Sequence, residues 1–279
     1  MNTQDILKLK LFTKLTSFSG SLSFLAIQIL AANAIMNKNN FNRKDFYFNK
    51  KCGIAINHLR MNRTIVYATK CDNGYNLHGV ISWASGYKIF DTLLIGFHYE
   101  SREYEVMAPF EEIEGFNIIE TPETFVGQSL NTVNIKLDNF FVKEEDIVSS
   151  NEIGNYTKNK SLSKTVHYAL YGIGSGVIEE IENEDFKKYT KKRLKDIKKK
   201  FLNSKDGREL DELRIILFNF IQKVVTTQII LYGGKSILTT KNLQRYYREL
   251  IMFNSNGLNQ EIKELFWHRF ILEDNKTYA

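Results

Sequence analysis

The chain has 279 residues, of which 43% are apolar and 13% aromatic, and its 38 basic and 32 acidic residues give a formal net charge of +6. This composition excludes an intrinsically disordered chain, and the small basic excess favours anionic partners only weakly. Cys52 and Cys71 are too few for the disulfide framework of a secreted protein of this length, so we predict a reducing, cytoplasmic location.

Residues 1–45 are predicted to form a short N-terminal helical segment. Apolar residues recur near the 3.6-residue period over 21–36, which predicts a helix. Its apolar run, 22–36, is broken by polar side chains and is shorter than the roughly 20 residues that span a membrane. We therefore expect a buried helix and no membrane partner. The polar segment 37–51 is expected to be an exposed connection.

Residues 46–150 are predicted to form an all-β middle domain with an antiparallel sheet. Short runs of β-branched and aromatic residues between turn residues predict the strands. These runs are 53–59, 64–70, 75–83, 92–99, 104–109, 128–137 and 140–142. The dipeptide Asn73-Gly74 predicts a tight hairpin because both residues tolerate positive φ.

Residues 151–279 are predicted to form a helical bundle. Helical periodicity marks five segments. These are 163–182, 185–202, 209–232, 239–253 and 258–271. The helix near 185–203 is rich in lysine but carries an apolar stripe, so we interpret the lysines as a solvated face and expect no nucleic-acid partner. The histidines and cysteines are dispersed, so no metal site is expected.

The segment 75–86 reads as a strand that ends in an aromatic side chain, a hydroxyl and a glycine, and includes Trp83 and Ser85. The segments 90–99 and 132–148 follow it as further strands. In this order the three segments resemble the middle domain of the acyl-CoA dehydrogenase family, whose Trp-x-Thr/Ser element lies beside the flavin ring. Trp83 and Ser85 fall on those positions.

The helical region extends this resemblance. Gly233-Gly234 is similar to the family's glycine turn between helices, and 245–249 resembles the Tyr-Arg-Asp helix that follows it. The resemblance implies an α+β fold with a residual N-terminal helical segment, an antiparallel β-barrel or sandwich, and a bundle of four to five helices. It implies a truncated, divergent member, because the family normally begins with a larger helical domain.

The resemblance also implies an FAD cofactor, with Trp83, Ser85, Asn57, Gly233 and Gly234 as candidate contacts. Asn57 could bind a flavin carbonyl or could be a solvent-facing residue at a strand end. The two glycines could allow close approach of a neighbouring subunit's flavin or could form a helix C-cap. An acyl thioester or another small organic substrate is implied, and either a homo-oligomer or a hetero-oligomer with a full-length homologue.

The position of the family's catalytic glutamate is occupied by Asn256, whose amide cannot accept a proton. Glu249 and Glu261 lie nearby but are more simply interpreted as solvated helix residues. The catalytic residues are therefore unassigned. Two functions follow: an FAD-dependent oxidoreductase or flavin monooxygenase of this fold, or a non-catalytic, degenerate homologue that acts as a structural or partner subunit.

Overall fold

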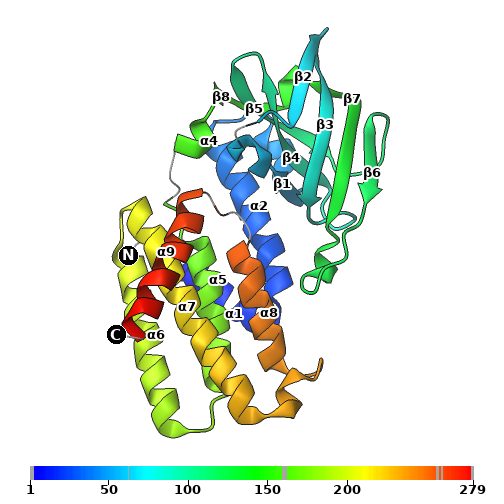
Figure 1. The fold of residues 1–279 in the computed structure, drawn as a ribbon. Coiled ribbons are helices and arrows are strands. Elements are labelled where there is room, and N and C mark those ends of the chain that lie inside the picture. Colours follow the sequence, from blue (N-terminus) through cyan, green and yellow to red (C-terminus); the bar gives the residue numbers. More distant parts are fainter. Residues whose placement is uncertain (1–2, 62, 159–161, 256–257, 259, 278–279) are drawn as a thin grey trace. The chain divides into compact units, whose positions relative to one another are not determined.

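The computed structural model describes residues 3–61, 63–158, 162–255, 258 and 260–277, and the chain divides into two compact units (Figure 1). One unit, Phe24–Asn159, contains the sheet, and the other combines Met1–Ser23 with Lys160–Ala279. The first 45 residues are therefore shared between the two units, whereas the sequence prediction groups them as one segment. The sequence prediction places its second boundary at 150, and the compact units divide after Asn159.

The described part of the first unit contains a sheet of eight strands in the order β6-β7-β3-β2-β4-β5-β8, with β1 paired to β4. The strands are β1 Cys52–Ala55, β2 Val66–Cys71, β3 Gly74–Ala84, β4 Thr92–Tyr99, β5 Arg102–Pro109, β6 Phe116–Glu120, β7 Val133–Lys143 and β8 Ile147–Glu152. Most pairs are antiparallel, as expected, but β4 pairs in parallel with β1 and β2. The sheet is therefore mixed.

The predicted hairpin joins β2 to β3, with its turn one residue earlier than expected. Cys71 pairs with Gly74, so the turn residues are Asp72 and Asn73, and Asn73 has a φ of 59°. Gly74 is required for a different reason, because a Cβ there would collide with the backbone oxygen of Val142 on β7. The glycine thus allows two strands to approach closely.

Helix α2, Gly20–Lys38, confirms the helix predicted over 21–36. Ala32 and Met36 are buried in a core cluster shared with β1, β4 and β5. Gln28, one of the polar breaks in the apolar run, is also buried, and its Oε1 accepts a hydrogen bond of 3.1 Å from the backbone N of Ile54. Gln28 interrupts the apolar pattern because its side chain supplies the hydrogen-bond acceptor for a backbone N–H of β1.

The prediction of an exposed connection over 37–51 holds for most of its residues but not for two aromatic side chains. This segment contains the short helix α3, Lys44–Phe48, and its Phe41 and Tyr47 are buried in the same core cluster as α2. The segment is polar by residue count, but its aromatic side chains alone are large enough to anchor it to the core.

Two buried carboxylates hold the short helix α4, Asn155–Lys158. Glu103 accepts hydrogen bonds from the backbone N atoms of Gly154 and Tyr156 at 3.2 and 3.1 Å. Glu105 accepts hydrogen bonds from the hydroxyls of Ser149 and Tyr156. Burial raises the pKa of both carboxyl groups above the ordinary value of 4.5. Their charged forms are therefore disfavoured in the folded protein.

The variant Glu105→Gln is expected to be more stable than the wild-type protein at pH 7. A carboxyl group with a raised folded pKa contributes stability at low pH and loses it as the pH rises through that pKa, whereas glutamine stays neutral throughout. Urea unfolding at pH 7 and pH 5 measures the effect, and the difference should shrink at pH 5. The exposed Glu114→Gln is the control for net charge, and a Glu105→Gln protein less stable than wild type at pH 7 would contradict the prediction.

The second unit is built from six main helices among its described residues. They are α1 Thr3–Phe18, α5 Thr165–Glu179, α6 Glu184–Asn203, α7 Gly207–Tyr232, α8 Asn242–Ser255 and α9 Gln260–Thr277. All five predicted C-terminal helices are confirmed. Helix α1 was not predicted, because its apolar residues do not form one clean stripe: Phe12 is buried, whereas Leu7 and Leu11 are exposed.

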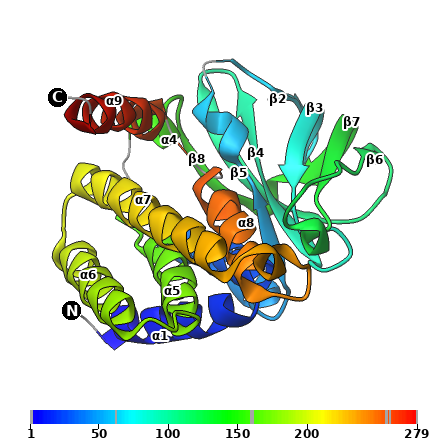
Figure 2. The same ribbon diagram turned by 60° about the horizontal axis from the view of Figure 1, so that its bottom comes forward.

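Three glycines on α5 account for its close packing. A Cβ at Gly172 would lie 3.0 Å from the backbone of α1, one at Gly174 would lie 3.0 Å from Ile221 of α7, and one at Gly176 would lie 2.5 Å from Tyr246 of α8. Each glycine thus admits a different neighbour, and α1 packs directly on α5 (Figure 2).

Helix α6 has the expected two faces. Leu194, Ile197 and Phe201 are buried, and its lysines lie toward solvent or are half-buried. By length and composition, α2 and α7 could each cross a membrane, and a third of each apolar window is buried. Two such helices are weak evidence for a membrane span, because core helices of other proteins meet the same criterion.

Candidate functional site

The pairing of β3 with β7 slips between Ile81 and Ala84, which places Trp83 in a β-bulge. Trp83 has a φ of 63°, a left-handed conformation that bulky residues rarely adopt. Its indole is 60% exposed. Bulges redirect side chains and are frequent next to binding sites. Here a strained backbone presents a flat aromatic ring to solvent.

The neighbouring strands hold the bulge in this conformation. The backbone N of Trp83 donates a hydrogen bond of 3.0 Å to Oδ1 of Asn134 on β7. Nδ2 of Asn134 donates in turn to Glu120 on β6 at 2.6 Å. Both ends of the amide are used, so the surrounding structure fixes the strained residue, as is typical of functional sites.

Ser85 lies just beyond the bulge, and its Oγ is 2.8 Å from Oγ1 of Thr132. Both residues are mostly buried. Each hydroxyl can donate one hydrogen bond, and the contact between the two uses only one of these donors. The other O–H can therefore donate a hydrogen bond to a ligand. The structure thus gathers Trp83, Ser85, Thr132 and Asn134 at one end of the sheet.

Asn57 is not joined to this group by any contact of the described residues. The predicted strand 53–59 ends at Ala55, and Asn57 begins a 3-10 turn, Asn57–Arg60, with its side chain exposed. His58 in this turn lies 2.7 Å from the backbone O of Gly96 through Nε2. Burial lowers the pKa of His58 to about 4, so the ring is neutral at pH 7 and has a structural role.

Gly233 and Gly234 end helix α7 in the second unit. Gly233 has φ 73° and ψ −164°, a region that only glycine occupies readily. Its backbone N donates to the O atoms of Ile229 and Ile230, so the C-cap interpretation is confirmed. A Cβ on either glycine would meet no atom within 4 Å. The close approach of a flavin at these glycines stays a prediction.

The variant Gly234→Ala separates the two interpretations of this turn. A Cβ at Gly234 would meet no atom of this chain within 4 Å, so we expect the variant's free energy of unfolding to differ from that of the wild type by less than about 1 kcal/mol. If a flavin approaches this backbone, FAD affinity should nevertheless fall. Thermal unfolding and FAD titration measure the two quantities. A stable variant with unchanged FAD affinity would restrict Gly234 to the helix end.

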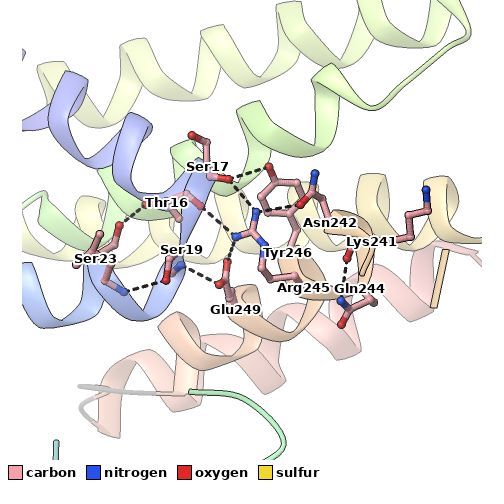
Figure 3. Close-up of polar contacts among 12 residues, drawn as sticks. Thr16, Ser17, Ser19, Ser23, Lys241, Asn242, Gln244, Arg245, Tyr246 and Glu249 are labelled. Carbon is pink, nitrogen blue, oxygen red and sulfur yellow. Dashed lines mark hydrogen bonds and ion pairs between the residues drawn. The ribbon is translucent and has the colours of Figure 1, made fainter. Parts of the chain in front are cut away.

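The interpretation of Glu249 as a solvated residue is wrong. Its side chain is buried, with Oε1 accepting from the backbone N of Gly20 at 2.8 Å and Oε2 accepting from Nη1 of Arg245 at 2.8 Å (Figure 3). Nη2 of Arg245 donates to the backbone O of Ser17 at 2.8 Å. Burial raises the pKa of Glu249, and Arg245 opposes this shift. Glu249 thus anchors the junction of α1 and α2 to α8.

The other positions near the expected catalytic base do not identify a catalytic residue. Asn256 and Gly257 lie outside the described residues. Glu261 is exposed on α9. Among the residues that the structure describes, no group of three or more histidine, cysteine, aspartate or glutamate side chains is placed to hold a metal ion.

No family model and no curated protein matches this sequence. Solved structures do match. Butyryl-CoA dehydrogenase from Megasphaera elsdenii has a TM-score of 0.75 and 10% identity, over 93% of this chain and 80% of that chain. XiaF from Streptomyces sp., in complex with FADH2 and glycerol, has a TM-score of 0.70 and 13% identity, over 94% and 80%. Dibenzothiophene monooxygenase from Paenibacillus sp. A11-2 has a TM-score of 0.70 and 12% identity, over 95% and 82%.

This chain has the acyl-CoA dehydrogenase fold. The α+β class and the helical C-terminal region predicted from the sequence are therefore confirmed. At these levels of identity the likeness establishes the fold alone. The matching structures include a dehydrogenase and a monooxygenase, and XiaF was solved in complex with FADH2.

The sequence predicts Trp83 and Ser85 as flavin contacts, which stays a prediction, and it did not predict the residues that hydrogen-bond to them. Thr132 and Asn134 were part of a matched segment, yet nothing in their spacing indicated that they face the bulge of β3. The alternation of small polar and apolar residues at the start of β7 was the only available signal. This alternation indicates a strand with one polar face, but it does not indicate that the strand's residues contact Trp83 and Ser85.

Proposed function

We propose that this chain is a flavin-dependent oxidoreductase whose flavin ring lies against the bulge of β3. The observation that carries this proposal is the exposed indole of Trp83, held by a backbone conformation that a tryptophan rarely adopts. Such strain is retained when it serves a site. A planar ligand is the natural partner, because aromatic rings associate by offset stacking.

The residues of the bulge fit a flavin ring. Trp83 offers an aromatic face, and the Ser85–Thr132 pair can donate one proton to an acceptor on the edge of the ring. Asn134 holds the backbone of Trp83 in place and does not itself need to touch the ligand. When bound, a flavin supplies the ability to accept a hydride from a substrate or to pass electrons to oxygen.

The names of two structural neighbours support a proposal for the substrate class. Butyryl-CoA dehydrogenase acts on an acyl thioester, and dibenzothiophene monooxygenase on an aromatic sulfur compound, as their names state. We infer an acyl thioester or another small organic molecule as the substrate. We also infer that the chain forms a homo-oligomer or associates with a full-length homologue.

Titration of the purified protein with FAD, followed by absorption between 350 and 500 nm, tests the proposal. We expect saturable binding that alters the flavin bands. Loss of the serine hydroxyl in Ser85→Ala should weaken binding about tenfold, the effect of one hydrogen bond. Ser82→Ala, an exposed serine on the same strand, is the matched control. A spectrum identical to that of free FAD at every concentration would exclude the proposal.

The second candidate is a non-catalytic partner subunit, and the position of Glu249 favours it. Both carboxylate oxygens of Glu249 are occupied by Gly20 and Arg245, so this residue cannot act as a base without releasing the anchor. A chain that leaves the FAD spectrum unchanged but forms a stoichiometric complex with a co-expressed full-length homologue would support this candidate.

A further inference from the structure

Helices α6, α7 and α9 of the helical unit line a pocket of about 260 Å³ that is open to solvent. One basic side chain from each helix lines it: Arg193 from α6, Lys223 from α7 and Arg269 from α9. Within this unit α7 packs against both α6 and α9 (Figure 2). The pocket thus concentrates three positive charges that are far apart in the sequence.

The other lining residues make the pocket amphipathic. Ile197, Ile216 and Phe220 supply apolar side chains and Asn219 an amide, and no acidic side chain is among the described lining residues. Neither Arg193 nor Arg269 forms an ion pair with a described carboxylate. Two guanidinium groups therefore line the same pocket without a carboxylate partner among the residues that the structure describes.

We propose that this pocket binds a small organic phosphate monoester. A guanidinium group matches two phosphate oxygens at once, and a lysine ammonium adds a point charge. A phosphate monoester carries about −1.5 to −2 charges at pH 7, which complements the two guanidinium charges. Its organic part would lie against Phe220 and Ile216.

The size of the pocket sets the size of the ligand. Pockets for drug-sized molecules span about 300 to 1,000 Å³, so a cavity of about 260 Å³ is too small for a dinucleotide such as FAD. The site is also formed entirely by the helical unit. It is therefore independent of the flavin proposed for the bulge of β3, and the two proposals can fail separately.

Calorimetric titration of the full chain, in the absence of flavin, with phenyl phosphate, inorganic phosphate and phenol tests the proposal. Phenyl phosphate presents both the anion and the apolar group, so we expect it to bind about tenfold more tightly than either of the others. Undetectable binding of phenyl phosphate at millimolar concentration, or equal affinity for inorganic phosphate, would overturn the proposal.

Charge variants locate the site. Arg193→Gln and Arg269→Gln should each weaken phenyl phosphate binding about tenfold, because each removes a charge-assisted contact. Lys195→Gln removes the same charge from an exposed position on α6 that does not line the pocket, and it should leave the affinity within about twofold. An equal loss in Lys195→Gln would overturn the assignment to this pocket. Circular dichroism confirms that each variant is folded.

Discussion

Replacing Arg245 by alanine is expected to lower the free energy of unfolding of the helical unit by about 3 kcal/mol, since removing one partner of a buried ion pair leaves the other charge uncompensated. The carboxylate of Glu249 would keep the hydrogen bond from the backbone N of Gly20 but lose its ion pair with Arg245. The hydrogen bond to the backbone O of Ser17 would also be lost. The junction between α1 and α2 would then be held to α8 far more weakly.

Urea unfolding followed by far-ultraviolet circular dichroism measures this loss. The control is Arg208→Ala, which breaks an exposed pair with Glu212 at 4.0 Å and should cost less than about 1 kcal/mol. Adding Glu249→Gln to Arg245→Ala should restore part of the stability, because a neutral amide can still accept from Gly20 without a buried charge. A loss in Arg245→Ala no larger than that in Arg208→Ala would show that the pair does not anchor the junction.

Replacing Trp83 is expected to separate binding from stability. Trp83→Ala should weaken FAD binding by roughly 10- to 100-fold, because stacking of a planar base on an aromatic side chain contributes about 1–3 kcal/mol. Trp83→Gly should lose binding equally but unfold at the same or a higher temperature, since glycine adopts a φ of 63° without strain. In this interpretation the strained backbone at Trp83 lowers the stability of the protein but exposes the indole to a ligand.

Flavin fluorescence titration gives the dissociation constants, and thermal scans give the melting temperatures. Trp267→Ala, which removes an exposed tryptophan of α9, is the matched control and should leave FAD affinity unchanged. If Trp83→Gly proved much less stable than wild type, the indole would be a packing residue. The interpretation of the bulge as a ligand platform would then be wrong.

Periodicity was sufficient to predict the five C-terminal helices and the long strands, because the apolar residues of each element face a core. It did not predict β6 or β8. Strand β8 includes Ser149, Ser150 and Asn151, whose polarity is typical of a loop, and only its pairing with β5 makes it a strand. Tertiary pairing overrides local propensity in such edge strands.

The residues that hold the candidate site in place were harder to predict than the motif that contains Trp83 and Ser85. Glu249 contacts Gly20 across 229 positions of sequence, and Trp83 contacts Asn134 across 51. No local pattern encodes such pairs. The motif around Trp83 and Ser85 could be recognised because it is contiguous, whereas the bulge that turns Trp83 outward depends on the register of β7.

The most direct test of the flavin proposal uses tryptophan fluorescence, because Trp83 and Trp267 are the only tryptophans in the chain. In Trp267→Phe all tryptophan emission comes from Trp83. If the flavin ring lies against the indole, FAD should quench this emission almost completely, with the same dissociation constant as the absorption titration. Emission that persists at FAD concentrations saturating the absorption change would place the flavin away from Trp83 and contradict the proposed site.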